Sequence, residues 1–521
     1  MTIANSIPHE GSEALVKFLR SLKSYPGKPR EVQVVETHIS WVFLTPRRAY
    51  KLKKPVQFDF LDFSTPEARR RACQDEVRLN RRLAKGVYLG VVPVTQSRGR
   101  FQFSGKGTAV DWVVKMHRLP AERMLDHLIR QKRDTTGDID RLSRVLTKFY
   151  RRASPVSISA AEYRAEIDAH IRANRQELLT AAHRFPPELV KRVHTAQLRF
   201  VAAEPRILED RVRQRRIIEG HGDLRPEHVC LLDVPVVYDC VEFNSELRTV
   251  DVIDELAFLA MECDFLGAPM IGKRVIDAYC AATGDRPPAR LIDFYQCYRA
   301  CVRAKVAAIR SQQLAHAARR AAHRLARRYL DLADRYRRRL GPPTLIVVRG
   351  LMGSGKSTLA KALADTLGGE LLQTDLLRRA MFGLRGSLAE FNEGVYQPSN
   401  RDRVYEEMLG RADGLLQTGL SVVLDGTFLH ARWRAAAAEL GARHGAQVCM
   451  VRCTCSDEIA RKRIAVRAQS GDTQSDARPE LYELQQRQEE PDPVDLPPSL
   501  VVDTSCSSAT PENVLTRLTV R

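Results

Sequence analysis

The chain lacks the features that mark secreted, membrane-spanning and zinc-binding proteins. Its 521 residues include 11 scattered cysteines and no Cys-x-x-Cys pair, so we expect neither a zinc site nor a disulfide framework, and a reducing compartment. No apolar run is long enough to cross a bilayer. The first residues show no basic segment followed by an apolar one, the pattern of a signal peptide. These absences predict a cytoplasmic protein that does not act on a membrane.

Acidic residues are also scarce relative to basic ones. The chain has 83 lysines and arginines against 63 aspartates and glutamates, which gives a net charge of +20. Such an excess is typical of proteins that bind the phosphates of nucleic acids. The densest basic stretch, 299–339, contains two acids and no base-reading motif, so we interpret it as a solvated helix face. Nucleic acid therefore stays a possible partner that the sequence does not favour.

The chain has no internal repeat of solenoid period, so we expect ordinary globular domains. Short strands and helices are indicated up to about residue 115, followed by mainly helical sequence. After the helix breaker Gly341-Pro342-Pro343, apolar strands alternate with helices, the pattern of a parallel sheet. The predicted divisions are a domain over 1–300, a basic helical linker over 301–342 and a domain over 343–521.

The strongest motif is a glycine-rich loop between a predicted strand, 344–349, and a predicted helix. This is the setting that the GxxxxGK[ST] phosphate loop requires. Backbone N–H groups of such a loop bind phosphate oxygens, its lysine reaches the β- and γ-phosphates, and its hydroxyl binds Mg²⁺. We therefore predict ATP and Mg²⁺ as ligands. The predicted nucleotide-binding residues are Gly350, Gly353, Ser354, Gly355, Lys356, Ser357 and Thr358, with Ser357 also on the metal.

Two carboxylates follow other predicted strands of the same sheet. Asp425 ends the strand 421–424 and is predicted to help hold Mg²⁺, with a turn cap as the alternative. Asp375 follows the strand 370–374. Because carboxyl ends of parallel strands open onto the ligand crevice, we predict that Asp375 takes a proton from an acceptor hydroxyl, with Arg378 beside it. A helix cap is the alternative for Asp375.

Arg463 and Arg467 follow the predicted strand 447–451 and lie on one face at helical spacing. We predict that they meet the transferring phosphoryl group from a lid, with a solvated basic face as the alternative. Over about 344–521 the chain resembles the small P-loop kinases of the polynucleotide-kinase-like and zeta-toxin-like group. This resemblance implies phosphorylation of a hydroxyl and leaves the acceptor open.

A second kinase-like pattern occupies the N-terminal half. His221-Gly222-Asp223 is followed by a predicted hairpin and then Asp239, the arrangement of a kinase catalytic loop and metal loop. We predict that Asp223 acts on the acceptor hydroxyl and that Asp239 holds Mg²⁺. Ala49-Tyr50-Lys51 resembles the Ala-x-Lys of the third kinase strand, and Glu76 interrupts the apolar stripe of a predicted helix. A buried carboxylate needs a partner, so we predict that Lys51 and Glu76 pair at the nucleotide, whereas a solvent-exposed Glu76 is the alternative.

The whole set resembles the aminoglycoside-phosphotransferase-like branch of the protein-kinase-like fold. Nearly the entire chain is similar to bacterial two-domain proteins that join such a domain to a P-loop kinase domain. The resemblance implies an α+β protein-kinase-like N-terminal domain followed by an α/β P-loop kinase domain with a parallel sheet. It rests on the motifs Thr37-His-Ile-Ser-Trp41, Phe60-Leu-Asp-Phe-Ser64, Leu79-Asn-Arg-Arg-Leu83 and Val241-Glu-Phe-Asn244.

One position departs from the kinase pattern. His228 stands five residues after Asp223, where kinases place a metal-holding Asn, and imidazole is a poorer Mg²⁺ ligand than a carbonyl oxygen. We predict a bifunctional ATP-dependent phosphotransferase that acts on unidentified hydroxyl-bearing substrates. Two alternatives stay open: a nucleic-acid end kinase, because of the charge, and a nucleotide-sensing regulator with an inactive N-terminal domain, because of His228.

Overall fold

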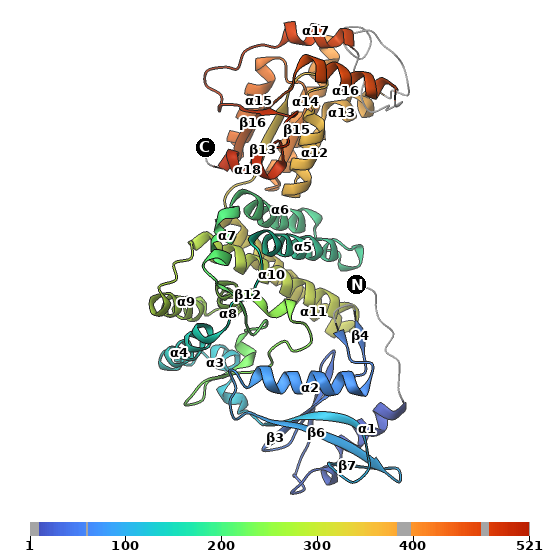
Figure 1. Cartoon of the computed structure of the whole chain (residues 1–521), viewed down its shortest axis with the longest axis vertical. Coiled ribbons are helices and arrows are strands. Elements are labelled where there is room, and N and C mark those ends of the chain that lie inside the picture. Colours follow the sequence, from blue (N-terminus) through green and yellow to red (C-terminus); the bar gives the residue numbers. More distant parts are fainter. Residues whose placement is uncertain (1–9, 59–60, 383–396, 470–478, 520–521) are drawn as a thin grey trace. The chain divides into compact units, whose positions relative to one another are not determined.

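The computed structural model describes residues 10–58, 61–382, 397–469 and 479–519 (Figure 1). The chain forms two compact units, each built from two stretches of sequence. Unit 1 comprises Met1–Ser157 and Arg211–Pro288, and unit 2 comprises Ile158–Asp210 and Ala289–Arg521. The domain limits proposed from the sequence, at residues 300 and 342, stay predictions. Phe60 of the second family motif lies outside the described residues.

Unit 1 begins with a six-stranded antiparallel sheet in the order β1-β2-β3-β8-β6-β7. Its two faces bury different partners because successive side chains of a strand point to opposite sides. Tyr50 and Leu52 pack with helix α1, whereas Ala49 packs with helix α2. The elements are α1 (Glu10–Arg20), β1 (Gln33–Glu36), β2 (Ser40–Leu44), β3 (Arg48–Lys53), α2 (Pro66–Asn80), β6 (Tyr88–Ser97), β7 (Arg100–Phe103) and β8 (Thr108–His117).

The rest of unit 1 is mainly helical. Among the described residues it carries three small two-stranded sheets, in which β4 (Gln57–Phe58) pairs with β5 (Leu61–Asp62), β10 with β11, and β12 with β9. Helix α8 is buried along most of its length. Its N-terminus is capped by Asp251, whose carboxylate accepts from the Ile253 N–H at 2.9 Å. The elements are α3 (Leu125–Arg130), α4 (Thr136–Arg152), β9 (Ile217–Glu219), β10 (Val229–Cys230), β11 (Val236–Val237), β12 (Thr249–Asp251), α8 (Val252–Phe265) and α9 (Pro269–Thr283).

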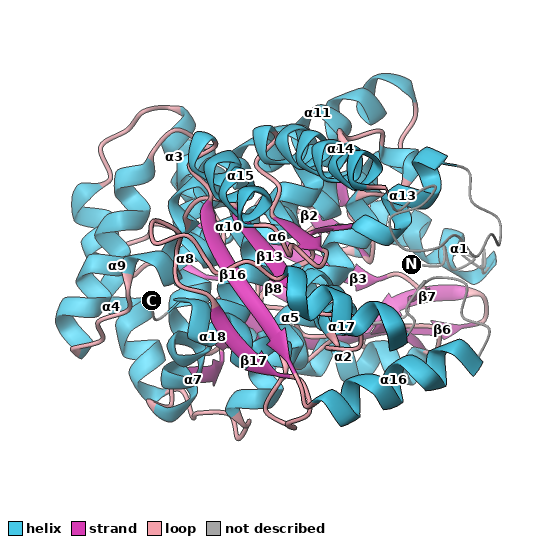
Figure 2. Ribbon diagram, turned by 90° about the horizontal axis from the view of Figure 1, so that it is seen from above, coloured by secondary structure: helices cyan, strands magenta, loops and turns pink. Residues whose placement is uncertain are grey.

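Unit 2 contains a five-stranded parallel sheet in the order β14-β15-β13-β16-β17, in which β16 lies between β13 and β17 (Figure 2). Helices cover both faces, since Leu345 and Val347 pack with α14 and α15 whereas Ile346 and Val348 pack with α12 and α18. The strands are β13 (Thr344–Arg349), β14 (Glu370–Gln373), β15 (Val422–Asp425), β16 (Gln447–Thr454) and β17 (Leu500–Asp503). The helices are α12 (Lys356–Leu367), α13 (Thr374–Phe382), α14 (Pro398–Gln417), α15 (Ala431–Arg443), α16 (Asp457–Gln469), α17 (Pro479–Gln488) and α18 (Pro511–Thr519).

Four further helices belong to unit 2: α5 (Ala160–Leu178), α6 (Pro187–Ala203), α10 (Ala289–Gln312) and α11 (His316–Arg337). Helices α5 and α6 reach the turn between α12 and β14, where Thr195 Oγ1 and Arg175 Nη1 donate to the Gly368 carbonyl at 2.8 and 2.9 Å. Lys191 adds an ion pair to Glu370 at 2.7 Å. Hydrogen bonds thus join helices from before residue 210 to the parallel sheet.

The two fold classes predicted from the sequence are confirmed. Unit 1 is an α+β protein-kinase-like fold, and the parallel sheet of unit 2 is an α/β P-loop kinase fold. In the described ranges, no helix combines the length and apolar character that a bilayer crossing needs.

Candidate active sites

The P-loop of unit 2 joins β13, which ends at Arg349, to α12, which begins at Lys356. Three of its glycines have positive φ: Gly350 at 149°, Gly353 at 75° and Gly355 at 78°. A Cβ on Gly350 would lie 2.5 Å from the main-chain oxygen of Cys453, and one on Gly353 would lie 2.7 Å from that of Ala460. The loop therefore needs glycine both for its backbone conformation and for its close approach to the neighbouring segments.

Lys356 and Ser357 open helix α12, and both are half-buried. In the part of the chain that the structure describes, the Lys356 ammonium has no hydrogen-bond or ion-pair partner. An unpaired ammonium at a helix N-terminus, beside a glycine-rich loop, is suited to binding a phosphate.

Asp425 lies at the end of β15, directly beside the strand that leads into the P-loop, since it pairs with Val348. Asp425 is buried, with 3% of its surface exposed. One carboxylate oxygen accepts from Gln373 Nε2 at 2.8 Å, whereas the other, Oδ1, is buried without a hydrogen-bond partner among the described residues. A buried carboxylate oxygen left in this state requires a water molecule or a cation.

Asp375 is the second residue of α13, just beyond the carboxyl end of β14. Its side chain is 42% exposed, and its Oδ1 accepts from Arg378 Nη1 at 2.9 Å. β14 and β15 are neighbours, with Gln373 opposite Asp425. Asp375 therefore lies at the same carboxyl end of the sheet as Asp425 and the P-loop. The structure thus brings these predicted residues to one edge.

Arg463 contacts both the P-loop backbone and the segment after β17. Its Nη1 donates to the Gly353 carbonyl at 3.2 Å and to Thr504 Oγ1 at 2.9 Å. Thr504 in turn donates to the Ser354 carbonyl at 2.7 Å. The guanidinium therefore braces the loop against the segment after β17. Arg467 lies in α16, and its side chain is outside what the structure describes.

Three predicted residues of unit 1 converge although they come from β3, α2 and the segment after β11. Lys51 Nζ lies 2.9 Å from Glu76 Oε1 and 2.7 Å from Asp239 Oδ1. Desolvation opposes the charge on Asp239, but Lys51 and then His228 outweigh it and hold the pKa of this carboxyl well below its usual range. Asp239 also has a φ of 63°, a conformation that Asp tolerates better than most residues.

A second buried lysine was missed by the sequence analysis. Lys53 Nζ lies 2.7 Å from Glu76 Oε2 and also pairs with Glu242, which follows Asp239 by three residues. Burial lowers the pKa of Lys53, but Glu242 and Glu76 outweigh it and raise the pKa above its usual value. The alternation that puts Lys51 on the α2 side of β3 also puts Lys53 there, so the signal was present in the sequence. Glu76 therefore holds both lysines.

Replacing Lys53 by methionine should strongly destabilise unit 1. It would leave Glu76 and Glu242 buried with one cation fewer, and breaking a buried pair costs about 3–5 kcal/mol. Lys54→Met is the matched control, because Lys54 pairs with a Glu36 carboxylate that is 57% exposed, and such pairs contribute about 1 kcal/mol or less. Denaturant unfolding followed by fluorescence should show the difference, since Trp41 and Trp112 lie in unit 1. Equal unfolding midpoints for both variants would contradict a stabilising role for the buried ion pairs of Lys53.

In the loop 221–228, Asp223 lies beside Arg225 and His228. Arg225 Nε lies 2.9 Å from Asp223 Oδ1. His228 Nδ1 lies 2.9 Å from the main-chain oxygen of Asp223, and His228 Nε2 lies 3.1 Å from Arg225 Nη2. His228 Nε2 also lies 3.6 Å from Asp239 Oδ2. Both nitrogens of His228 are thus engaged between the two predicted aspartates, and Arg225 is a site residue that the sequence analysis missed.

The backbone of this loop is fixed from helix α8. Glu255 accepts from the N–H groups of His221 and Gly222 at 2.6 and 2.7 Å and from Tyr150 Oη at 2.8 Å. Burial, and then the neighbouring His228, lower the pKa of His221 to about 3. His221 therefore stays uncharged near neutral pH and orients the loop through the Tyr238 carbonyl, 3.0 Å from its Nε2.

Mg²⁺ fits these donors only together with a nucleotide. Among the described residues, no group of three or more His, Cys, Asp or Glu side chains could hold a metal ion. Mg²⁺ is usually bound by one or two carboxylates plus substrate phosphates. The Oδ1 of Asp425 in unit 2, which lacks a hydrogen-bond partner among the described residues, and the partly exposed carboxylate of Asp239 in unit 1 agree with that donor set.

The glycine loop on a parallel sheet and the Lys–Glu–Asp convergence beside an antiparallel sheet define this chain as a protein that combines a P-loop kinase fold with a protein-kinase-like fold. A family model described as an AAA domain matches residues 345–491. The uncharacterized protein Rv2004c of Mycobacterium tuberculosis is 34% identical over 446 residues, which cover 84% of this chain and 86% of the relative. The uncharacterized protein Mb2027c of Mycobacterium bovis matches to the same extent. The chain belongs to the family of these mycobacterial proteins.

Solved structures of kinases are similar to parts of the chain. A gluconokinase from Sinorhizobium meliloti 1021 is 21% identical, with a TM-score of 0.24, and the match covers 34% of this chain and 89% of that one. A choline/ethanolamine kinase family protein from Mesorhizobium loti is 13% identical, with a TM-score of 0.37, and the match covers 61% of this chain and 99% of that one.

Proposed function

We propose that unit 2 transfers the γ-phosphoryl group of ATP to a hydroxyl group of an acceptor molecule. The observation that carries this proposal is that an unpaired cation and an unsatisfied carboxylate lie at the same carboxyl end of the parallel sheet. Lys356 is a cation without a partner among the described residues, and Asp425 is a buried carboxylate with one unsatisfied oxygen. ATP with Mg²⁺ would meet both needs, because its phosphates bind the ammonium and its metal binds the carboxylate.

Each residue has a proposed role in this transfer. The glycines and N–H groups of the P-loop bind the phosphates, and Lys356 reaches the β- and γ-phosphates. Ser357 and Asp425 would hold Mg²⁺, which neutralises phosphate charge when bound. Asp375 accepts the proton of the acceptor hydroxyl, while its ion pair with Arg378 at 2.9 Å orients the carboxylate. Arg463 supports the loop, and Arg467, one helical turn further along α16, is proposed to meet the transferring group.

The test is to incubate the full chain with ATP labelled at the γ-phosphate and with fractionated cell metabolites. We expect label in a hydroxyl-bearing compound, and loss of that product in Lys356→Met but not in Lys51→Met. A product that depends on Lys51 alone would assign the transfer to unit 1 instead. No labelled product from any fraction would contradict the proposal for unit 2.

For unit 1 we propose a second ATP site in which Lys51, oriented by its ion pair with Glu76, binds the phosphates, Asp239 holds Mg²⁺ and Asp223 faces an acceptor. The protein would then be bifunctional. The engagement of both His228 nitrogens favours a second candidate: unit 1 binds nucleotide as a regulator without turnover. The two candidates differ in whether the loop supplies a second ligand for the metal.

Replacing His228 by asparagine should distinguish the two candidate functions of unit 1. An amide oxygen is a better Mg²⁺ ligand than imidazole, so the Mg²⁺ concentration needed for nucleotide binding by unit 1 should fall severalfold. The measurement is a titration of a fluorescent ATP analogue in a Lys356→Met background, in which unit 1 alone reports. His127→Asn is the control, because His127 is exposed on α3. An unchanged Mg²⁺ requirement would contradict a metal role at position 228.

A further inference from the structure

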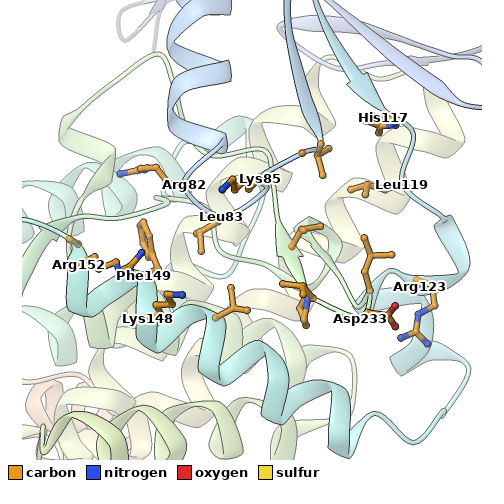
Figure 3. Close-up of a pocket in the computed structure, with 18 of the residues that line it drawn as sticks. Arg82, Leu83, Lys85, His117, Leu119, Arg123, Lys148, Phe149, Arg152 and Asp233 are labelled. Atoms are coloured by element: carbon orange, nitrogen blue, oxygen red, sulfur yellow. The ribbon is translucent and has the colours of Figure 1, made fainter.

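A large pocket opens in unit 1, with a volume of about 1470 Å³ (Figure 3). Its wall is made by the turn after α2, the segment after β8, the tip of the β10-β11 hairpin and the last turns of α4. Lys51, Asp223 and Asp239 do not line it. The pocket is therefore separate from the proposed nucleotide site of unit 1.

The charge of this pocket is strongly unbalanced, with six lysines and arginines in its lining against two acids, Glu219 and Asp233. Some cations are committed to the fold: Arg82 donates to the carbonyls of Glu219 and Gly220, and Arg123 donates to that of Leu231. Glu219 is likewise occupied by Arg248 at 2.9 Å.

Three other cations of the lining are exposed: Lys85, Lys148 and Arg152. Within the described residues none of them has a hydrogen-bond or ion-pair partner. They come from two elements, the turn after α2 and the last turns of α4, and they line the same pocket (Figure 3). A ligand with negative charge would complement them.

The pocket also offers apolar surface between these charges. Leu83, Val87 and Val236 form part of its lining, and Val234 at the hairpin tip is 69% exposed. The ligand should therefore carry apolar side groups as well as acids. Phe149 also lines the pocket, but it is buried and covered by the Arg82 guanidinium at 5.3 Å, so it offers no open ring on which a base could stack.

The basic surface continues past the pocket. A second pocket of about 560 Å³ shares Lys148 and Arg152 with the first and adds Arg144 and Arg151 of α4. Typical small-molecule pockets hold ~300–1000 Å³, so one small anion would leave most of this space unfilled. An elongated ligand that crosses α4 at Lys148 and Arg152 matches the arrangement better.

We propose that these two pockets form a docking groove for an acidic peptide segment of a partner protein, with apolar side chains between its carboxylates. The groove is also linked to the proposed nucleotide site along the chain, because its lining residue Val236 belongs to β11 and Asp239 follows two residues after the end of that strand. The Val237 N–H donates to the Leu83 carbonyl at 3.3 Å, which joins that hairpin to the turn after α2. A docked segment would therefore contact the hairpin whose other end leads into Asp239.

The test is a selection of short random peptides, displayed on phage, against the full-length protein. Selected peptides are then measured by fluorescence anisotropy on the wild type and on the triple variant Lys85→Glu, Lys148→Glu and Arg152→Glu. We expect enrichment of segments that combine acidic and apolar residues, and a loss of affinity of at least about tenfold in the triple variant. The control is Lys17→Glu, Lys28→Glu and Lys106→Glu, which makes the same charge change at exposed lysines of unit 1 outside the groove and should keep full affinity.

Several results would overturn the proposal. One is a selection without acidic segments, and another is equal loss of affinity in the groove and control variants, which would indicate attraction by net charge alone. Replacing the acids of a selected peptide by their amides should abolish binding, and unchanged binding would remove the charge argument. Tighter, groove-dependent binding of single-stranded RNA than of any selected peptide would make this surface a nucleic-acid site instead. Matching thermal melts of the two triple variants check that both are folded.

Discussion

Replacing Lys356 by methionine should remove one of two ATP-binding events of the full-length protein, with the affinity of that site falling by about a hundredfold, or ~2.7 kcal/mol. The ammonium opens α12 and lacks a partner among the described residues, so its charge is available for phosphate. Methionine keeps the length and apolar stem of the side chain and removes the charge. Calorimetry with a non-hydrolysable ATP analogue should give a stoichiometry near two for the wild type and near one for the variant.

Lys361→Met is the control for this prediction. It makes the same substitution in the same helix at an exposed position, so the affinity at both sites should stay as in the wild type. Because Lys356 makes no ion pair within the described chain, its replacement should also leave the unfolding midpoint of unit 2 unchanged. If the Lys356 variant still binds two equivalents with wild-type affinity, the P-loop is not a nucleotide site.

Asp375→Asn should lower the rate of phosphoryl transfer by about a hundredfold or more, the usual scale for loss of a general base. ATP affinity should stay nearly unchanged, because Lys356, Ser357 and Asp425 are the residues proposed for the phosphates and the metal. Asparagine keeps the shape of the side chain but cannot take the proton of the acceptor hydroxyl. The measurement is single-turnover transfer to the acceptor found with labelled ATP, alongside calorimetry for ATP.

The control for Asp375→Asn must also remove an ion pair between a carboxylate and an arginine of a helix. Glu407→Gln does this, since Glu407 and Arg411 pair at 2.7 Å on the exposed side of α14. Its rate should equal that of the wild type. A collapse of ATP affinity in Asp375→Asn would place this residue in the metal site instead. An unaffected rate would exclude Asp375 as the general base and would leave it only a role as a cap at the start of α13.

The P-loop was predictable from sequence because its conformation is encoded by adjacent residues. Glycines that allow positive φ, a preceding apolar strand and a following helix are all local features. The alternation of apolar strands with helices likewise predicted the parallel sheet, and the sheet in turn places Asp375 and Asp425 at the edge where the loop lies.

Lys53 shows where this kind of prediction stops. The sequence offers Lys51, Lys53 and Lys54 within four positions, and alternation alone places the first two on one face of β3. Which acids they meet depends on α2 and on the segment after Asp239, which packing brings to the strand from elsewhere in the chain. Arg225 was missed for the same reason, because its contacts with Asp223 and His228 depend on how the loop 221–228 is bent around Asp223.

By itself, then, the sequence determined the phosphate loop, the parallel sheet and the identity of the paired lysine and glutamate, since these follow from backbone conformation, periodicity and the need of a buried charge for a partner. The fold class of unit 1 was predicted from the resemblance of its motifs to those of kinases. Only the tertiary structure decided that Lys51 also binds Asp239, that Arg463 braces the P-loop, that helices from before residue 210 are joined to the parallel sheet, and that segments from four parts of unit 1 form a basic groove. The physical reason is that these arrangements depend on the packing of segments distant in sequence, which local residue patterns do not specify.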